Sequence, residues 1–186
     1  MNIYSYADCA ILHFRSTYYI NMGGGAMENI RPITEDDDIK IVKIIRANLE
    51  AYGLDISGTA YFDPELDHLS KYYAEKPGKR EYLIASGENG EVIGGVGLAE
   101  FDGFENCAEI QKLYLSDKVK GKGMGKRLMQ VAEETARQKG YSRVYLETHS
   151  VLEAAIGLYK KLGFYEIKKP EFVLHTTMDR FYTKEI

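Results

Sequence analysis

The sequence predicts an α/β domain in which a mixed sheet carries helices on both faces. Strand-like and helix-like hydrophobic patterns alternate from residue 27 onward, which is typical of a layered α/β architecture. A glycine-rich turn at 120–125 lies between a strand pattern and a helix pattern. The composition is that of a globular domain, since 45% of the 186 residues are hydrophobic and 28% are charged.

Charge and cysteine usage exclude several classes of protein. With 24 basic and 28 acidic residues the net charge is −4, which argues against non-specific binding to nucleic acid. Cys9 and Cys107 lie far apart and no Cys/His spacing suggests zinc, so we expect no metal. Since no apolar run reaches about 18 residues and no basic segment precedes the first apolar run, we expect a soluble, cytoplasmic protein with no membrane contact.

The first 26 residues differ from the rest. Residues 10–14 and 18–20 have extended-type patterns, and three glycines at 23–25 end any regular element. We predict that residues 1–26 are an extension and that 27–186 form the domain. Three glycine codons before Met27 can encode a purine-rich ribosome-binding sequence, so we interpret Met27 as the natural start and 1–26 as a possible non-native leader.

The first half of the domain predicts a strand, two helices and a hairpin. A strand over 27–33 is followed by Thr34, a typical N-cap, and by an acidic run that suits a helix N-terminus. The expected core stripe of this helix recurs at helical spacing: Ile39, Val42, Ile45 and Leu49, widened by Ile41 and Ile44. Asp63-Pro64 opens a second helix that runs to Tyr73. Residues 82–85 and 92–98 then form a hairpin around a turn at 88–90.

The second half continues the alternation. A strand at 109–115 leads into the glycine turn, and an amphipathic helix follows over 125–139 with Gly140 after its last turn. Its inward residues are Leu128, Val131, Ala132, Thr135 and Ala136. A strand at 143–147 precedes a helix at 154–162, which Gly163 closes, and 164–167 begins a last pair of strands.

The glycine turn is suited to a pyrophosphate. Glycines at 121, 123 and 125 let successive main-chain N–H groups point into one concavity, and the following helix adds its unpaired first-turn donors. Basic side chains surround the turn: Lys118, Lys120, Lys122, Lys126 and Arg127. The plain alternative is a flexible loop with a solvated basic flank.

Two nucleotide-binding motifs fail here. A P-loop requires glycine at position 120 and serine or threonine at 127, which are Lys120 and Arg127. The dinucleotide-binding fingerprint GxGxxG also fails, because its third glycine would have to stand one residue after Gly125.

The sequence resembles the GNAT acetyltransferases in two motifs. Lys120-Gly121-Lys122-Gly123-Met124-Gly125 matches their [Q/R]-x-x-G-x-[G/A] turn except for Lys120, which keeps the charge but lacks the planar fork of arginine. The segment 155–164 is similar to their A-x-x-L-Y-x-K-x-G-F motif. The resemblance extends in element order over about residues 30–167. It implies a mostly antiparallel mixed sheet whose splayed strands hold acetyl-CoA as co-substrate.

The resemblance also implies the site residues. The amine attacks the thioester directly, and Tyr159, at the family's tyrosine position, would protonate the departing thiolate; the plain alternative is a packing aromatic. The cofactor would be held by Leu113, Tyr114 and Leu115, with one main-chain amide directed at the acetyl oxygen, and by Lys120, Gly121, Lys122, Gly123, Met124, Gly125 and Lys126.

The general base has two candidates. Glu109 lies on the strand whose glutamate some family members use as a base through water, and Glu147 lies on the neighbouring strand. Glu109 can equally be an ordinary strand carboxylate, and Glu147 ranks second to it as a base. The family often has asparagine seven residues before the tyrosine, but Leu152 stands there, which leaves His149 or Ser150 as substitutes.

The resemblance implies an enzyme that acetylates a primary amine of a small molecule or peptide. Residues 52–65 would recognise the acceptor, and their acidic and aromatic side chains suit a cationic amine. The alternative is a non-catalytic acyl-CoA-binding or regulatory module on the same fold. A homodimer is also compatible with the resemblance.

Overall fold

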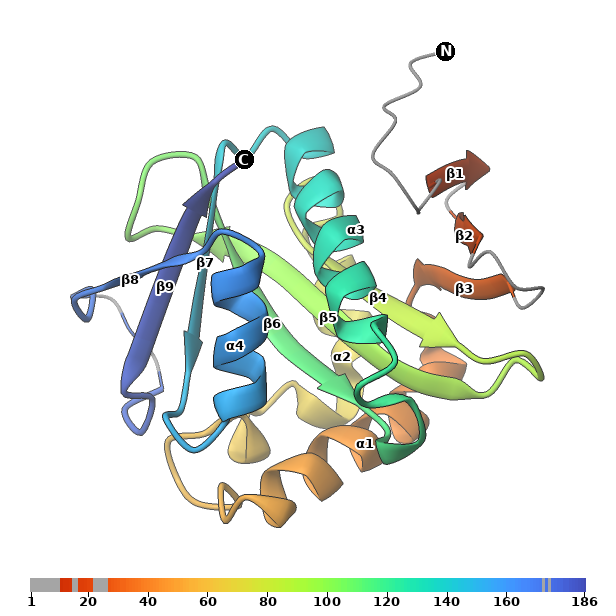
Figure 1. Cartoon of the computed structure of the whole chain (residues 1–186), viewed down its shortest axis with the longest axis horizontal. Coiled ribbons are helices and arrows are strands. Elements are labelled where there is room, and N and C mark those ends of the chain that lie inside the picture. The colour runs from red at the N-terminus through yellow and green to blue at the C-terminus, as the bar shows by residue number, and fades with distance from the viewer. Residues whose placement is uncertain (1–10, 15–16, 22–26, 172, 174) are drawn as a thin grey trace.

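The computed structural model of the chain describes residues 11–14, 17–21, 27–171, 173 and 175–186. Nine strands of this described part form one sheet in the order β1-β2-β3-β4-β5-β6-β7-β9-β8 (Figure 1). Their bounds are β1 Ile11–Phe14, β2 Thr17–Asn21, β3 Met27–Pro32, β4 Glu81–Ser86, β5 Val92–Phe101, β6 Cys107–Leu115, β7 Arg143–Thr148, β8 Tyr165–Ile167 and β9 Arg180–Glu185. Only β6 and β7 pair in parallel among these strands. The predicted mixed, mostly antiparallel sheet is confirmed.

Helices cover both faces of the sheet, as predicted (Figure 1). The α-helices are α1 Asp38–Ala51, α2 Leu69–Ala74, α3 Met124–Gln138 and α4 Glu153–Lys161. Short 3-10 helices lie at Glu35–Asp37, Ala60–Phe62, Leu66–His68 and Asp117–Val119. Alternate residues of β4 point to opposite faces, as the period of a strand requires. Leu83 and Ala85 pack in the core with α3 and α4, whereas Tyr82 and Ile84 pack with α1 and α2.

The first helical segment begins after Thr34, as predicted, with one 3-10 turn before α1. The main-chain N–H and the hydroxyl of Thr34 both donate to Asp37, at 2.9 and 2.8 Å, which satisfies polar groups at the start of the helix. The buried stripe is Ile41, Val42, Ile45 and Leu49. The prediction that Ile39 belongs to this stripe is wrong, since this residue is 71% exposed.

The second helix begins later than predicted. Residues 63–65 are not helical; a 3-10 turn starts at Leu66 and α2 at Leu69. The reason is tertiary, because the carboxylate of Asp63 is bound by Lys112 and His175 instead of a helix N-terminus. The hairpin β4-β5, helix α3 and helix α4 lie where the sequence predicts them.

The N-terminal strands extend the sheet beyond β3. β1 pairs with β2 and β2 with β3, both antiparallel. The predicted break at 23–25 lies outside the described residues, and the natural start at Met27 stays a prediction. No helix in the described ranges is long and apolar enough to cross a membrane.

Candidate active site

The site lies where β6 and β7 part. Their parallel pairing ends at Glu109 and Tyr145, although β6 continues to Leu115 and β7 to Thr148. A cavity of about 700 Å³ opens at this point, lined by residues from α1, β6, the glycine turn, β7 and α4. The expected splayed sheet is therefore present, and it leaves one side of β6 without a neighbouring strand.

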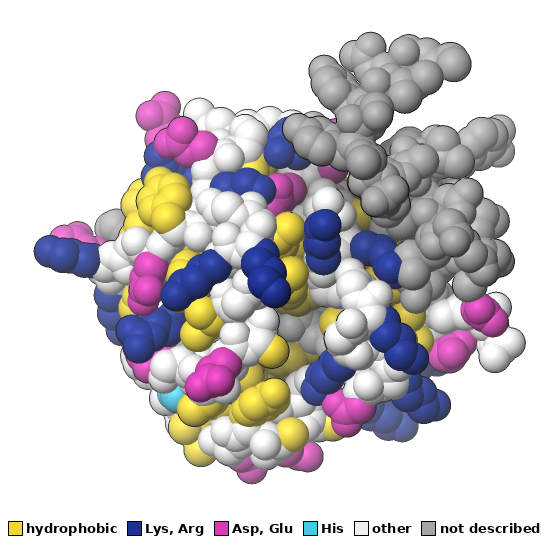
Figure 2. Space-filling model, viewed as in Figure 1, with side chains coloured by type: hydrophobic (Ala, Val, Ile, Leu, Met, Phe, Trp, Pro, Cys, Tyr) yellow, Lys and Arg dark blue, Asp and Glu magenta, His cyan; other side chains and the backbone are white. Residues whose placement is uncertain are grey.

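The glycine turn and the first turn of α3 form one end of the cavity. Gly123 is the residue before α3 and has φ +87°, which a side chain rarely adopts. Most of the predicted cofactor residues line the cavity: Leu113, Tyr114, Leu115, Lys120, Gly121, Gly123, Gly125 and Lys126. Figure 2 shows Lys and Arg side chains on this face around a hollow with hydrophobic side chains inside it. The arrangement suits a ligand with an anionic end and an apolar stem.

Two predicted cofactor residues lie elsewhere. The side chain of Met124 is 1% exposed and packs in the core with α3, because it falls on the inward stripe of the helix. Lys122 is exposed and is not part of the cavity wall. The predicted contribution of these two residues through the main-chain N–H groups of the turn stays a prediction.

A bulge interrupts β6 in the middle of the cavity wall. Gly95 pairs with Tyr114 and Gly97 with Gln111, so two β6 residues oppose Val96 alone. Lys112 has φ +49°, in the left-handed region, and the hydroxyl of Tyr82 donates to its carbonyl at 2.9 Å. Since a bulge leaves main-chain groups outside the ladder, this stretch of β6 can present them to a ligand.

Tyr159 reaches the cavity from α4. Its side chain is buried and packs near the rings of Phe164 and Tyr182, at centroid distances of 6.0 and 6.3 Å. Burial raises the pKa of the Tyr159 hydroxyl well above its ordinary value, so the phenol stays protonated at neutral pH. Tyr159 lines the cavity. Within the described part of the chain its hydroxyl makes no hydrogen bond to a protein group.

Glu109 is a buried carboxylate at the parting of the strands, with 9% of its surface exposed. The side chain of Gln111 donates to it at 2.6 Å and in turn accepts from the hydroxyl of Tyr73 at 3.0 Å. Burial and the nearby charge of Glu147 raise the pKa of Glu109 to about 7. A carboxylate with this pKa can accept a proton near neutral pH.

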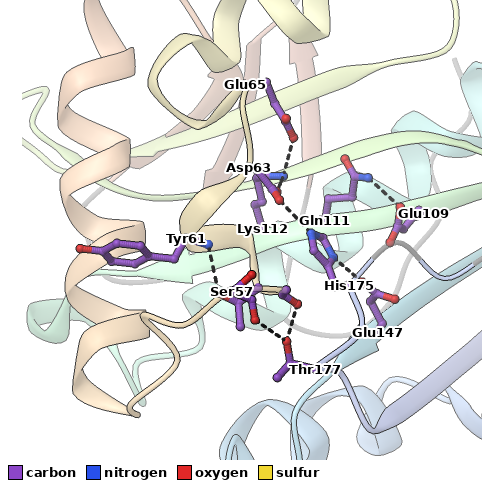
Figure 3. Close-up of polar contacts among 12 residues, drawn as sticks. Ser57, Tyr61, Asp63, Glu65, Glu109, Gln111, Lys112, Glu147, His175 and Thr177 are labelled. Atoms are coloured by element: carbon purple, nitrogen blue, oxygen red, sulfur yellow. Dashed lines mark hydrogen bonds and ion pairs between the residues drawn. The ribbon is translucent and has the colours of Figure 1, made fainter.

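Glu147 is bound by His175, a residue for which the sequence carries no functional signal. Nδ1 of His175 bonds Glu147, and Nε2 lies 3.0 Å from Asp63 (Figure 3). Burial lowers the pKa of His175, but the bonds to Asp63 and Glu147 outweigh it and raise the pKa to about 10. The imidazolium therefore forms ion pairs with both carboxylates.

Lys112 continues this row of charges. Its ammonium lies 2.6 Å from Asp63 and 3.0 Å from Glu65. Burial lowers the pKa of Lys112, yet the two carboxylates outweigh it and leave the pKa above its ordinary value. Glu65, Lys112, Asp63, His175 and Glu147 thus alternate in sign along one side of the site (Figure 3).

Leu152, His149 and Ser150 are the residues at and near the position where the family often has asparagine. Leu152 lines the cavity, whereas His149 and Ser150 are not in its wall. Ser150 donates through its hydroxyl and its main-chain N–H to Asp179, both at 2.7 Å. His149 accepts from the main chain of Val151 at 3.2 Å. Neither side chain takes the place of the asparagine.

In the described residues no group of three or more His, Cys, Asp or Glu side chains is arranged to hold a metal ion.

Comparison with known proteins identifies the family. The model of the acetyltransferase (GNAT) family matches residues 49–164, and the chain belongs to this family. An uncharacterized N-acetyltransferase of Escherichia coli K12, YjgM, is 39% identical over 140 residues, which are 74% of this chain and 82% of the relative.

Solved structures agree in fold. A GNAT-family acetyltransferase from Staphylococcus aureus Mu50 superposes with a TM-score of 0.74 at 20% identity, covering 85% of this chain and 98% of that one. The acetyltransferase yncA from Salmonella typhimurium, solved with its cofactor acetyl-CoA, has a TM-score of 0.66 at 24% identity and covers 85% and 93% of the two chains.

Proposed function

We propose that the protein transfers the acetyl group of acetyl-CoA to a primary amine of a small molecule or peptide, by direct attack in a ternary complex. The observation that carries this proposal is the joint placement of Glu109 and Tyr159 in the wall of one cavity at the parted strands. One residue is suited to accept a proton and the other to donate one. The family membership and the acetyl-CoA bound by yncA support the choice of co-substrate.

The cofactor would lie along the cavity from the glycine turn to the bulge. Main-chain donors at Gly121, Gly123 and Gly125, with Lys120 and Lys126, would bind the pyrophosphate at the positive end of α3. Residues 113–115 would hydrogen-bond the pantetheine arm on the side of β6 that β7 leaves open. Lys120 also pairs with Asp117 at 2.7 Å, an exposed contact that a phosphate can displace.

Glu109 would act as the base, directly or through a water. It removes a proton from the ammonium of the acceptor, and the neutral amine forms a bond to the thioester carbonyl carbon. Charge then develops on the acetyl oxygen, where a main-chain N–H of the bulge would stabilise it. Collapse of the tetrahedral intermediate breaks the carbon–sulfur bond, and Tyr159 donates its proton to the CoA thiolate. The nitrogen that has formed the amide bond loses its surplus proton, which returns to the Tyr159 phenolate directly or through water, and Glu109 releases its proton to solvent.

Glu147 is the weaker candidate for the base. Its carboxylate is already engaged in an ion pair with His175. Glu109 has the opposite environment, since burial and a neighbouring negative charge raise its proton affinity. The two strand carboxylates are thereby given different tasks.

The alternative is a non-catalytic acyl-CoA-binding module, and turnover separates the two. CoA release would be followed with a thiol reagent over a panel of primary amines, with wild type and Tyr159→Phe. Release that depends on an amine and falls in the variant supports the enzyme. Saturable acetyl-CoA binding without release for any amine would favour the module.

A further inference from the structure

Lys112 combines two unfavourable features at one position. It is a non-glycine residue with φ +49°, a conformation that side chains seldom adopt. Its side chain is also only 3% exposed, and a buried ammonium needs paired carboxylates. Such features persist where the surroundings fix them, and they occur often at functional sites. Lys112 lies in the cavity wall, at the bulge of β6.

The residue is anchored at both ends. At the main chain, the hydroxyl of Tyr82 donates to the Lys112 carbonyl at 2.9 Å. At the side chain, the ammonium pairs with Asp63 and Glu65, at 2.6 and 3.0 Å. Asp63 and Glu65 belong to the segment that precedes α2 (Figure 3), and Ala60 of the same segment lines the cavity. Lys112 therefore connects this segment to the bulge.

Asp63 extends the connection to a third part of the chain. Its Oδ1 lies 3.0 Å from Nε2 of His175, and the neighbouring Thr177 donates through its hydroxyl to the carbonyl of Gly58. A Cβ on Gly58 would lie 2.6 Å from the hydroxyl oxygen of Thr176, so the two segments meet closely. The residues near 58–65 and near 175–177 are thus held together and against β6.

Resting on the acetyl transfer proposed above, we infer that Lys112 is a positioning residue. Its ion pairs with Asp63 and Glu65 hold the bulge of β6 and the acceptor-side segment 58–65 in one fixed relation. The bulge amide that faces the acetyl oxygen and the wall that faces the amine are thereby aligned before either substrate binds. Lys112 itself exchanges no proton with the substrates, because both carboxylates stabilise its ammonium.

Kinetics of Lys112→Met test this role. We expect kcat to fall on the order of 10²-fold, the size of effect that small misplacement of reacting groups produces. The dissociation constant of acetyl-CoA, measured by calorimetry, stays within about twofold of wild type, since the glycine turn is untouched. Lys112→Arg retains the charge and restores most of the lost kcat.

Two further variants complete the experiment. Lys139→Met removes another partly buried lysine, whose ammonium pairs with Glu81 at 2.9 Å outside the cavity; it lowers the melting temperature but leaves kcat unchanged. Glu65→Gln breaks one of the two pairs of Lys112 while Asp63 keeps both of its own, and it lowers kcat less than Lys112→Met does. It serves as the deciding variant if Lys112→Met does not fold.

The outcomes separate the two proposals. A folded Lys112→Met with wild-type kcat, or one that loses only melting temperature as Lys139→Met does, overturns the positioning role. The same conclusion follows if Glu65→Gln has wild-type kcat where Lys112→Met is unfolded. If wild type itself releases no thiol with any amine, the acetyltransferase proposal has failed, and the role of Lys112 fails with it.

Discussion

Nε2 of His175 lies 3.0 Å from Oδ1 of Asp63, although 112 residues separate the two in the chain. The same imidazole bonds Glu147 on β7 through its other nitrogen. One side chain from the β8–β9 connection therefore ties the segment that precedes α2 to β7. Two carboxylates that would repel each other are held by the cation between them.

Replacement of the proposed base gives the first prediction. Glu109→Gln keeps the shape and the contact with Gln111 but cannot accept a proton, so kcat should fall by about 10²- to 10⁴-fold. Steady-state thiol release measures it. Glu105→Gln, at an exposed position near the start of β6, is the matched control and should retain full activity. Wild-type rates in Glu109→Gln would contradict the assignment.

The pH profile gives the second prediction. Only ionised Glu109 accepts a proton, and its pKa is about 7, so wild-type kcat/KM should rise about tenfold per pH unit below pH 7 and bend near 7. Because the acceptor binds as its ammonium, kcat/KM should stay level above pH 7 until the amine loses its proton in solution. In Glu109→Gln the bend near 7 disappears, and the residual rate should instead rise with the fraction of neutral amine; an unchanged profile would assign the bend to another group.

The glycine turn gives the third prediction. Gly123 has φ +87° and, as alanine, would be strained by about 1–2 kcal/mol. If relief of that strain moves the first amides of α3, the KM for acetyl-CoA rises about tenfold with little change in the KM of the amine. Gly78→Ala is the control, because a Cβ there has no neighbour within 4 Å. Equal KM values in both variants would argue against a phosphate cradle.

The fourth prediction concerns stability. The pKa of His175 rises from 6.5 unfolded to about 10 folded, so its protonation stabilises the fold fully below pH 6.5 and this contribution is lost as pH rises toward 10. The melting temperature of His175→Gln should therefore lie below that of wild type at pH 6, and the difference should shrink by pH 10. Calorimetry across this range measures it; a difference that grows with pH would refute the ion pairs.

Local patterns made much of the fold predictable. Helix α3 and the hairpin β4-β5 follow from periodicity and turn residues that lie within a few positions of one another. The first turn of α1 was misjudged at Ile39, since helical spacing alone does not say where the edge of a buried stripe falls. The start of α2 was misjudged because distant cations bind Asp63, and tertiary contacts override a local capping preference.

The site residues likewise fall into those that the sequence predicts and those that only the fold brings together. Tyr159 and Glu109 were found through motif and strand position, and both line the cavity. Lys112 carried a weak signal as the one charge in an otherwise uncharged strand segment, Ile110 to Leu115. His175 carried none, because nothing in the sequence near it indicates that it meets Asp63 and Glu147. Ion pairs between remote segments depend on the finished fold.

The parting of β6 and β7 has a consequence beyond catalysis. Past Glu109, the edge of β6 that faces β7 has no strand partner among the described residues, and under the proposed function acetyl-CoA would bind along this open edge. Occupancy would then contribute to the folding equilibrium by mass action. The lifetime of the protein against unfolding and proteolysis would follow the local abundance of acetyl-CoA, so that the enzyme persists longest when its acyl donor is plentiful.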